Sequence, residues 1–184
     1  MPFPGTISLR ADTLMALIKD ICTSLYQHGF RNFVLLLGHG GNYAVMQAAA
    51  QELVTELPEA RVVFLNWLPA AHRHYAEIFG SEREGGGHGG HGETAQLLVT
   101  HPNLVEMDRA REYWSQEAEE AEDDDHPLLG GGIYEAQRNW KEFAPYGVTG
   151  NPIPATADEG DKVYEVIVDW IIDAMKKTLL KGYQ

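Results

Sequence analysis

Helical and extended hydrophobic patterns alternate along the first half of the chain. Apolar residues recur at helical spacing over residues 12–28, and this pattern stops at Gly29, a residue type common at the C-terminal cap of a helix. A continuous apolar run at 33–37 is typical of a strand buried on both faces of a parallel sheet. Helical spacing resumes over 42–56, and residues 61–66 form a second buried-strand candidate. The pattern therefore predicts a strand–helix–strand unit.

Short connections between these elements predict a parallel sheet with helices on its faces, a three-layer α/β sandwich. Further helices are expected at 69–79, 93–100 and 157–180, with an extended piece at 104–107. We find no internal repeat and no convincing linker, so residues 1–184 are interpreted as one domain.

The charge balance excludes several partners. The 184 residues include 27 Asp and Glu against 14 Lys and Arg, a formal net charge of -13. Such a protein repels phosphate backbones and anionic lipid surfaces, so we expect neither a nucleic acid nor a membrane partner. Part of the acidity is concentrated at 117–125, which is interpreted as a solvated loop.

The cysteine content and the apolar segments of the chain indicate its cellular compartment. Cys22 is the single cysteine and lies in an apolar helical stretch, where a small buried side chain is expected rather than a disulfide. The amino end shows no basic region followed by an apolar one, and no stretch has the roughly 20 apolar residues that a membrane-spanning helix needs. A cytoplasmic location is the expectation.

The first candidate for chemistry is the run Gly38-His39-Gly40-Gly41-Asn42, which lies between a predicted strand and a predicted helix. In open α/β sheets ligands bind at this edge, so His39 should face the crevice, and Asn42 is suited to cap the helix. Two alternatives stay open. A phosphate-binding loop would need G-x-G-x-x-G or a Lys-Ser/Thr ending, and neither is present. His39 could also serve a structural hydrogen bond in a tight turn.

The second candidate is His88-Gly89-Gly90-His91-Gly92-Glu93, which places three potential ligands within six residues. Imidazole and carboxylate groups are the usual donors for Zn, Mn or Fe, and a catalytic site keeps one position open for water. The alternatives are a flexible surface tract that traps metal and, for Glu93, a carboxylate that stabilises the amino end of a helix.

Four segments resemble the creatininase (creatinine amidohydrolase) family and follow one another along the chain as they do in that family. In chain order they are Phe-Pro-Gly-Thr-Ile-Ser-Leu at 3–9, the run at 38–42, the His-Gly-Gly-x-x-Glu-Thr run at 88–94, and Gly-Asn-Pro-x-x-Ala-Thr-Ala-x-x-Gly at 150–160. The similarity thus extends over nearly the whole chain.

The resemblance implies an α/β protein with a mainly parallel sheet, assembled into oligomers, that hydrolyses an amide or other C–N bond, often cyclic, in a small molecule. It also implies one or two divalent metals (Zn, Mn or Fe), which activate water, and a histidine near the substrate that moves a proton to the leaving nitrogen. The resemblance implies metal binding for His39, catalysis for His88 and a substrate-binding position in the pocket wall for Trp67. We further expect metal binding for His91, catalysis for Glu93 and substrate binding for Asn42.

Two departures from the family pattern shape a second hypothesis. His91 stands where most members carry a metal-binding Glu. The family's opening segment, with a Glu-x-His pair and a later Asp, has no counterpart in these residues, so we expect the first βα units and three ligands to be missing. The alternative function is therefore a non-catalytic subunit, or one that a second chain completes.

Overall fold

A computed structural model describes residues 3–115 and 140–180 and divides the chain into two compact units. Unit 1 consists of Met1–Thr6 and Leu68–Asp169, and unit 2 consists of Ile7–Trp67 and Trp170–Gln184. The predicted acidic loop at 117–125 lies outside the described residues. That the whole chain is one domain without its first βα units stays a prediction.

Unit 2 contains the predicted strand–helix–strand unit. Its elements in chain order are α1 (Ala11–Gln27), β1 (Asn32–Leu36), α2 (Tyr43–Glu56) and β2 (Arg61–Leu65). The two strands pair in parallel, with Asn32 opposite Arg61 at one end and Leu36 opposite Leu65 at the other. The hydrophobic periodicity therefore predicted all four elements to within two residues at each end.

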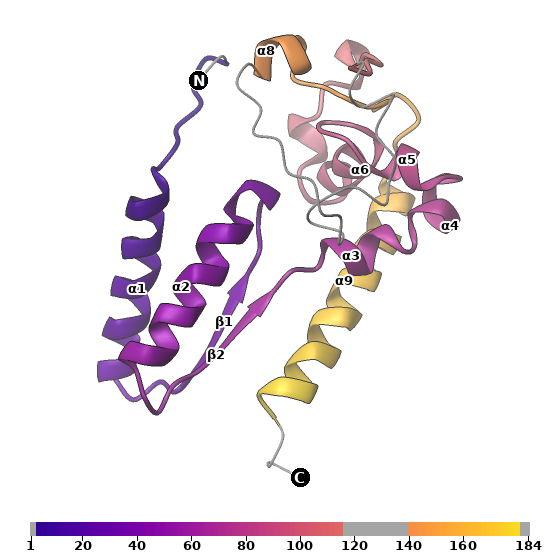
Figure 1. Ribbon diagram of the computed structural model, residues 1–184. Coiled ribbons are helices and arrows are strands. Elements are labelled where there is room, and N and C mark those ends of the chain that lie inside the picture. The colour runs from indigo at the N-terminus through magenta and orange to yellow at the C-terminus, as the bar shows by residue number, and fades with distance from the viewer. Residues whose placement is uncertain (1–2, 116–139, 181–184) are drawn as a thin grey trace. The chain divides into compact units, whose positions relative to one another are not determined.

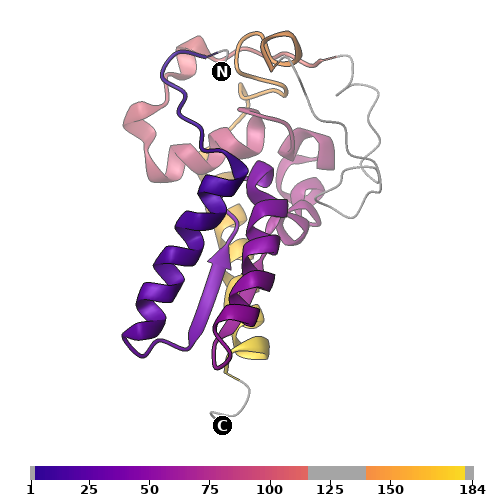
Figure 2. The same cartoon turned by 60° about the vertical axis from the view of Figure 1, so that its left-hand side comes forward.

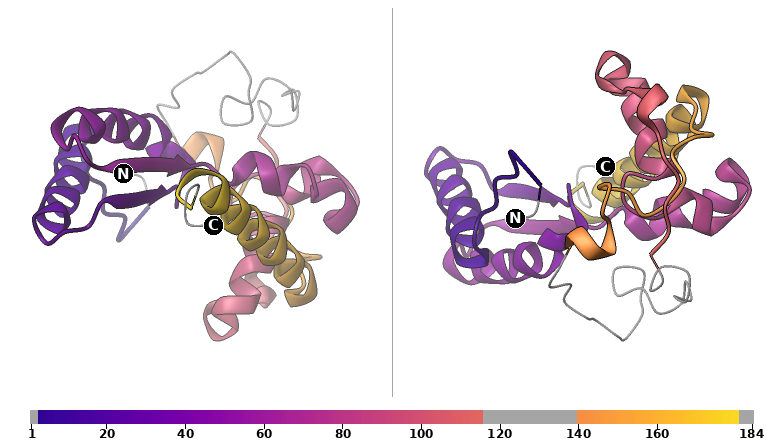
Figure 3. Two further views of the ribbon diagram at one scale, coloured as in Figure 1. Left: turned by 90° about the horizontal axis from the view of Figure 1, so that it is seen from below. Right: turned by 90° about the horizontal axis from the view of Figure 1, so that it is seen from above.

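Helices cover both faces of this strand pair. Helices α1 and α2 lie side by side on one face (Figures 1 and 2). The C-terminal part of α9 (Ala157–Thr178), which belongs to unit 2 from Trp170 onward, lies on the other side of the strands, as Figure 1 and the views from below and above in Figure 3 show. The Arg61 guanidinium on β2 donates a 3.0 Å hydrogen bond to the Leu179 carbonyl just after α9. The predicted layered α/β architecture is confirmed.

The core of unit 2 forms where α1 and α2 meet the strands. Cys22, Phe33, Leu53 and Leu57 are buried together, with Cys22 only 4% exposed, so its predicted role as a small apolar side chain is confirmed. Helix α1 ends as expected at Gly29, whose φ of +93° suits glycine and whose N–H donates to the Tyr26 carbonyl.

Unit 1 is mainly helical in its described part. Its elements are α3 (Leu68–His72), α4 (Tyr75–Phe79), α5 (Glu82–Gly85), α6 (His91–Thr100), α8 (Trp140–Phe143), the first part of α9, and the 3-10 turns η2 (Pro102–Leu104) and η3 (Met107–Arg109). The extended piece predicted at 104–107 is therefore wrong, because these residues belong to the two 3-10 turns and their link.

The single helix predicted at 69–79 is also wrong, because the chain breaks between α3 and α4. After the break Tyr75 and Phe79 are both buried, and their rings occupy the space beside Gly85. A Cβ at Gly85 would lie 2.4 Å from the Tyr75 ring. Tertiary packing of these aromatic rings thus overrides the continuous helical pattern.

Two helices of unit 1 approach each other closely. A Cβ at Gly160 of α9 would lie 2.2 Å from the Ala95 carbonyl oxygen of α6, and Ala95 and Val163 are fully buried. Glycine at 160 therefore permits direct backbone contact. None of the helices in the described part of the chain combines the length and apolar character needed to cross a membrane.

Candidate active site

His39 lies at the carboxyl end of β1. The Leu37 N–H still donates to the Leu65 carbonyl (3.0 Å), and the chain then leaves the sheet. His39 has an extended backbone, is exposed, and precedes the 3-10 turn η1 (Gly40–Asn42) that leads into α2. The position predicted for this histidine, between a parallel strand and the following helix, is confirmed; its role is not tested by this geometry.

Asn42 does not cap α2 as expected. Its side chain makes no capping hydrogen bond, and its backbone (φ -91°, ψ -4°) is helical rather than extended. The reason is that Asn42 is the last residue of η1, whereas a capping residue needs an extended backbone to aim its side chain at the free N–H groups. The half-buried Asn42 side chain is therefore not committed to a helix cap.

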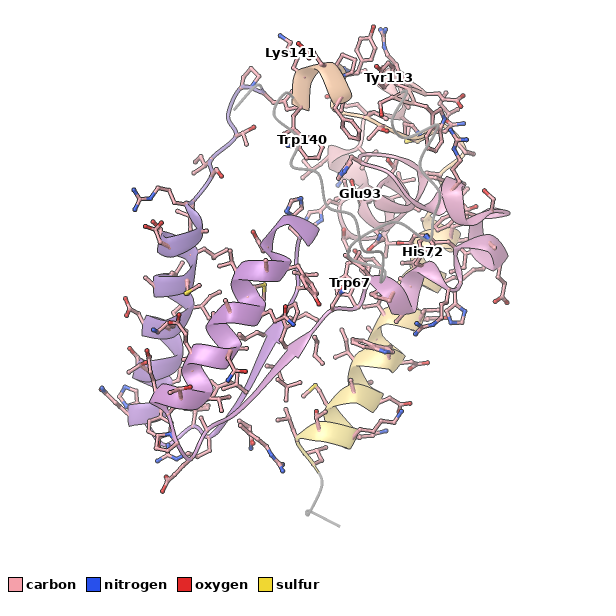
Figure 4. The ribbon with its side chains drawn as sticks, viewed as in Figure 1. Trp67, His72, Glu93, Tyr113, Trp140 and Lys141 are labelled. Atoms are coloured by element: carbon pink, nitrogen blue, oxygen red, sulfur yellow. The ribbon has the colours of Figure 1, made fainter. Side chains whose placement is uncertain are left out.

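Trp67 follows β2 at the same edge of the strand pair (Figure 4). Its indole N–H donates a 2.7 Å hydrogen bond to the Leu37 carbonyl, which directly precedes the 38–42 loop. The ring is half-buried, so one part of it packs while the rest stays accessible. Within unit 2, His39 and Trp67 thus share the edge where parallel sheets bind ligands.

In unit 1, the backbone of His88 is held by a distant partner. Its N–H donates to the Thr149 carbonyl and its carbonyl accepts from the Thr149 N–H, both at 2.8 Å. This pairing requires glycine at 87, where φ is +82° and a Cβ would lie 1.9 Å from the Thr149 oxygen. Glycine at this position therefore allows a close approach of the two backbones.

The His88 ring is flanked by two aromatic rings of α8. The Trp140 ring lies edge-to-face at a centroid distance of 5.0 Å and the Phe143 ring at 6.2 Å. The two aromatic rings also contact each other at 5.3 Å. Trp140 remains 38% exposed, so His88 sits beside an aromatic surface that is open on one side.

Glu93 stabilises the loop that carries His88. Its Oε2 accepts the Gly89 N–H at 2.7 Å, and the carboxylate lies in the first turn of α6, where the helix dipole favours a negative charge. Burial, followed by the charge of Glu93, raises the pKa of the Tyr75 hydroxyl to about 12. Glu93 itself is exposed and so accessible from solvent.

His91 is the buried member of the group. It is 4% exposed, and the Phe79 ring lies against it at a centroid distance of 4.6 Å. Its Nε2 lies 3.0 Å from Glu159 Oε2, whereas its buried Nδ1 has no hydrogen-bond partner among the described residues. A nitrogen of this kind is unusual, because buried polar atoms normally have partners.

Sequence reasoning missed Glu159, the residue that holds His91. Its Oε2 also accepts the Thr156 N–H (2.9 Å) and hydroxyl (2.7 Å), while the Glu159 N–H donates to the Thr156 hydroxyl oxygen. This is a capping box, and its Thr-x-x-Glu pattern just before an apolar helix was readable in the sequence. Burial raises the pKa of the Glu159 carboxyl, but the hydrogen bonds from His91 and Thr156 outweigh it, so the pKa is lowered.

The residues fit a divalent cation in part. Metal-binding histidines usually pair one ring nitrogen with a carboxylate, and His91 has a carboxylate oxygen 3.0 Å from its Nε2 and no partner at its Nδ1 among the described residues. Within residues 3–115 and 140–180, however, no three His, Cys, Asp or Glu side chains gather closely enough to hold a metal. The described donors therefore do not complete a site.

The six candidate residues fall into two groups. Three of them lie in unit 1, in the glycine-rich loop and the first turn of α6, with separate side-chain contacts, and three others lie at the sheet edge of unit 2. The first group is His88, His91 and Glu93, and the second is His39, Asn42 and Trp67.

Comparison with known proteins assigns the chain to a family. The creatininase (creatinine amidohydrolase) family model matches residues 1–175, so the chain belongs to the creatininase family. A creatinine amidohydrolase from Pseudomonas putida is 30% identical over 95% of this chain and 66% of its own length. A mycofactocin precursor peptide peptidase from Mycobacterium ulcerans (strain Agy99) is 29% identical over 91% of this chain and 56% of its own length. The chain thus spans between half and two thirds of these relatives.

Solved structures support the same fold. A creatininase designated Mn superposes with a TM-score of 0.70 at 28% identity, covering 96% of this chain and 67% of the other. A mutant creatininase of the Zn-Zn type gives a TM-score of 0.76 at 24% identity, with the same coverage, and shows likeness of fold alone. A divalent metal is therefore a property of structures within this family.

Proposed function

We propose that the chain acts as a metal-dependent hydrolase that cleaves an amide or other C–N bond, often cyclic, in a small molecule. This proposal rests on the family match over residues 1–175, together with the two backbone hydrogen bonds that fix His88 in its loop. The matched relatives are an amidohydrolase and a peptide peptidase, and both names denote cleavage of C–N bonds.

His88 is the proposed proton carrier. Two backbone hydrogen bonds to Thr149 fix its Cα, and the edge-to-face contact with Trp140 restricts the ring. A histidine held in this way can give a proton to the leaving nitrogen as the C–N bond breaks, because its ordinary pKa lies near neutrality. Trp140 and Phe143 contact one side of the ring, and the His88 side chain is otherwise exposed, so a substrate can reach it.

Glu93 is proposed to act beside His88. Its carboxylate is exposed and is anchored by the Gly89 N–H, four residues before it, so it can accept a proton or a substrate N–H at the surface of the loop. Asn42 and Trp67 are proposed to contact the substrate, the first through an amide not used as a helix cap and the second through its indole face.

His39 and His91 are the proposed metal ligands. A divalent Zn, Mn or Fe ion, when bound, would supply a water of lowered pKa and a positive charge that polarises the scissile carbonyl. Support for His91 comes from its buried Nδ1 and its carboxylate partner. Support for His39 comes from its position at the carboxyl end of β1.

The test is a hydrolysis assay on the purified chain. The protein is supplied in turn with Zn, Mn or Fe, and release of amine or ammonia is followed for cyclic amides, linear amides and short peptides. We expect His88→Ala to abolish hydrolysis, whereas His101→Ala, an exposed histidine after α6, leaves it unchanged. Absence of hydrolysis in a folded, metal-supplied protein would refute this function for the chain.

A second candidate is a partner-completed or non-catalytic subunit. It is favoured by the lack of three gathered metal donors in the described residues. Under this proposal a homo-oligomer or a second chain supplies further ligands. Metal content separates the two candidates: one or more tightly held metal ions per purified chain supports the first, and a weakly held, sub-stoichiometric metal supports the second.

A further inference from the structure

The outer edge of β1 carries backbone groups without partners. The odd-numbered residues of this strand bond to β2, and the series ends where the Leu37 N–H donates to the Leu65 carbonyl at 3.0 Å. Because successive residues of a strand direct their N–H and C=O groups to opposite sides, the residues between them direct theirs away from β2, where no other described residue bonds them. These residues are Asn32, Val34 and Leu36. The strand therefore presents an open edge that a further strand can join.

The segment before α1 is a second stretch of unpaired backbone. Residues 7–10 of unit 2, hereafter the arm, form no helix, strand or turn, and Arg10 has an extended backbone (φ -70°, ψ 156°). The N–H groups of Ile7, Ser8 and Leu9 have no acceptor among the described residues. Ile7 is 92% exposed and Leu9 is 51% exposed. Two large apolar side chains, two positions apart, share one face of an extended chain, as in a strand that packs on a core.

An apolar stripe of α1 lies on the side of the open edge. Lys19 marks the side of α1 that faces α2, because its ammonium pairs with Glu52 and Glu56. Each residue turns a helix by about 100°, so Leu17 and Ile21, two positions before and after Lys19, point away from α2. They are 48% and 52% exposed. Since α2 packs on β2 as well as on α1, the far side of α1 is the side of β1.

Charge indicates what can cover these surfaces. Residues 7–9, the strand Asn32–Leu36 and the two stripe residues of α1 include no Asp, Glu, Lys or Arg. A chain with a net charge of -13 repels a second copy of itself over most of its surface, so two copies can approach closely only where charge is absent. The open edge, the stripe and the arm together form such an uncharged region.

We propose that two copies of the chain exchange arms, so that the arm of each copy adds as a strand to the open β1 edge of the other. The exchange pairs the free backbone groups of both segments, and it lets Ile7 and Leu9 pack against Leu17 and Ile21. Reciprocal exchange of one element closes with two-fold symmetry and leaves neither edge open. This inference goes beyond the proposed function and does not depend on hydrolysis.

Sedimentation equilibrium of the whole chain tests the exchange. We expect a reversible dimer. Ile7→Ser combined with Leu9→Ser should raise its dissociation constant by roughly 100-fold, because each large apolar side chain lost from the contact costs about a factor of ten. Ile153→Ser, which changes a 57% exposed side chain of unit 1, is the control and should leave the dissociation constant unchanged. A chain that stays monomeric, or a dimer that the double variant leaves unchanged, overturns the proposal.

Hydrogen exchange locates the added strand. The Val34 and Leu36 amides should be protected in the wild-type dimer and should lose this protection in the double variant. The Leu37 amide, which donates to β2, should stay protected in both proteins. A dimer in which the Val34 and Leu36 amides exchange freely has its contact elsewhere, and this result overturns the proposal. A monomer in which they are protected shows that the arm binds β1 of its own copy, which overturns exchange between copies.

Discussion

The indole N–H of Trp67 and the main-chain carbonyl of Leu37 are joined by a 2.7 Å hydrogen bond. The bond connects the residue that follows β2 to the residue that precedes the His39 loop. Since Leu37 is 1% exposed, its carbonyl depends on such a donor for satisfaction. The side chain proposed to contact substrate therefore also fixes the backbone from which the first candidate loop starts.

Replacing Trp67 tests this double role. Trp67→Phe keeps an aromatic ring but removes the donor, and we expect it to lower the free energy of unfolding by about 1–3 kcal/mol, since a buried carbonyl loses its partner. Urea denaturation followed by circular dichroism measures the change. Trp170→Phe on α9 is the control for loss of an indole. Equal stability of Trp67→Phe and wild type would contradict the structural role of the bond.

Glycine at position 87 is predicted to be indispensable for the pairing of His88 with Thr149. Gly87→Ala introduces both a positive-φ strain and a Cβ at 1.9 Å from the Thr149 oxygen, so the loop must move. Gly80→Ala is a matched control, because φ is +88° there but no atom lies within 4 Å of the added Cβ. We expect the control to cost roughly 1–2 kcal/mol.

The comparison of the two glycine variants is the measurement that matters. Thermal denaturation should show a larger loss for Gly87→Ala than for Gly80→Ala, and hydrogen exchange should show the His88 and Thr149 amides losing protection only in Gly87→Ala. Equal loss of stability in the two variants, with both amides still protected, would contradict the prediction that the close contact at Gly87 stabilises the loop.

The elements of unit 2 were predictable from the sequence because their signals are local. Apolar spacing and Gly29 define α1, β1, α2 and β2, and each depends on residues within about 15 positions. The glycine-rich loop differs, since His88 pairs with Thr149 and His91 with Glu159, 61 and 68 positions away. No pattern within the loop specifies those partners.

The site illustrates the same limit at the level of single residues. The histidines and Glu93 stood out by clustering, whereas the aromatic flank of His88 comes from α8, 52 residues further along. Glu159 could have been found through its capping box with Thr156, but that pattern predicts a helix start and not a contact with His91. The contact between Glu159 and His91 depends on how distant parts of the chain fold together, and the local sequence around Glu159 does not specify it.

Trp140 is predicted to influence hydrolysis through His88. Trp140→Ala removes the ring that lies 5.0 Å from the imidazole, and since an aromatic pair contributes about 0.5–1.5 kcal/mol, we expect kcat/KM to fall by up to about tenfold. Trp140→Phe should restore most of the loss. Trp114→Phe serves as the control, since this indole donates to Glu112 instead. An unchanged kcat/KM in Trp140→Ala would show that the Trp140 ring does not contribute to the proposed site.

Tyr75 gives the protein a predictable loss of stability at alkaline pH. Burial, reinforced by the charge of Glu93, raises its pKa from 10.0 in the unfolded chain to about 12. Between these values the unfolded chain has lost the phenolic proton and the folded chain retains it, so unfolding releases a proton and stability falls as the pH rises. The loss begins near pH 10 and levels off near pH 12, amounting to roughly 3 kcal/mol for a shift of this size.

Tyr75→Phe removes the titrating group and should flatten this part of the stability profile, while Tyr146→Phe, a residue 63% exposed, should leave the slope unchanged. Both variants are checked by measuring the free energy of unfolding in urea at several pH values from 9.5 to 12. This range covers the pKa of Tyr75 in the unfolded chain and in the folded chain. A wild-type slope that persists in Tyr75→Phe would show that another group causes it. If the pH dependence disappears in Tyr75→Phe, the loss of stability at alkaline pH is caused by the Tyr75 phenol, which is buried beside Gly85 and close to the loop that carries His88.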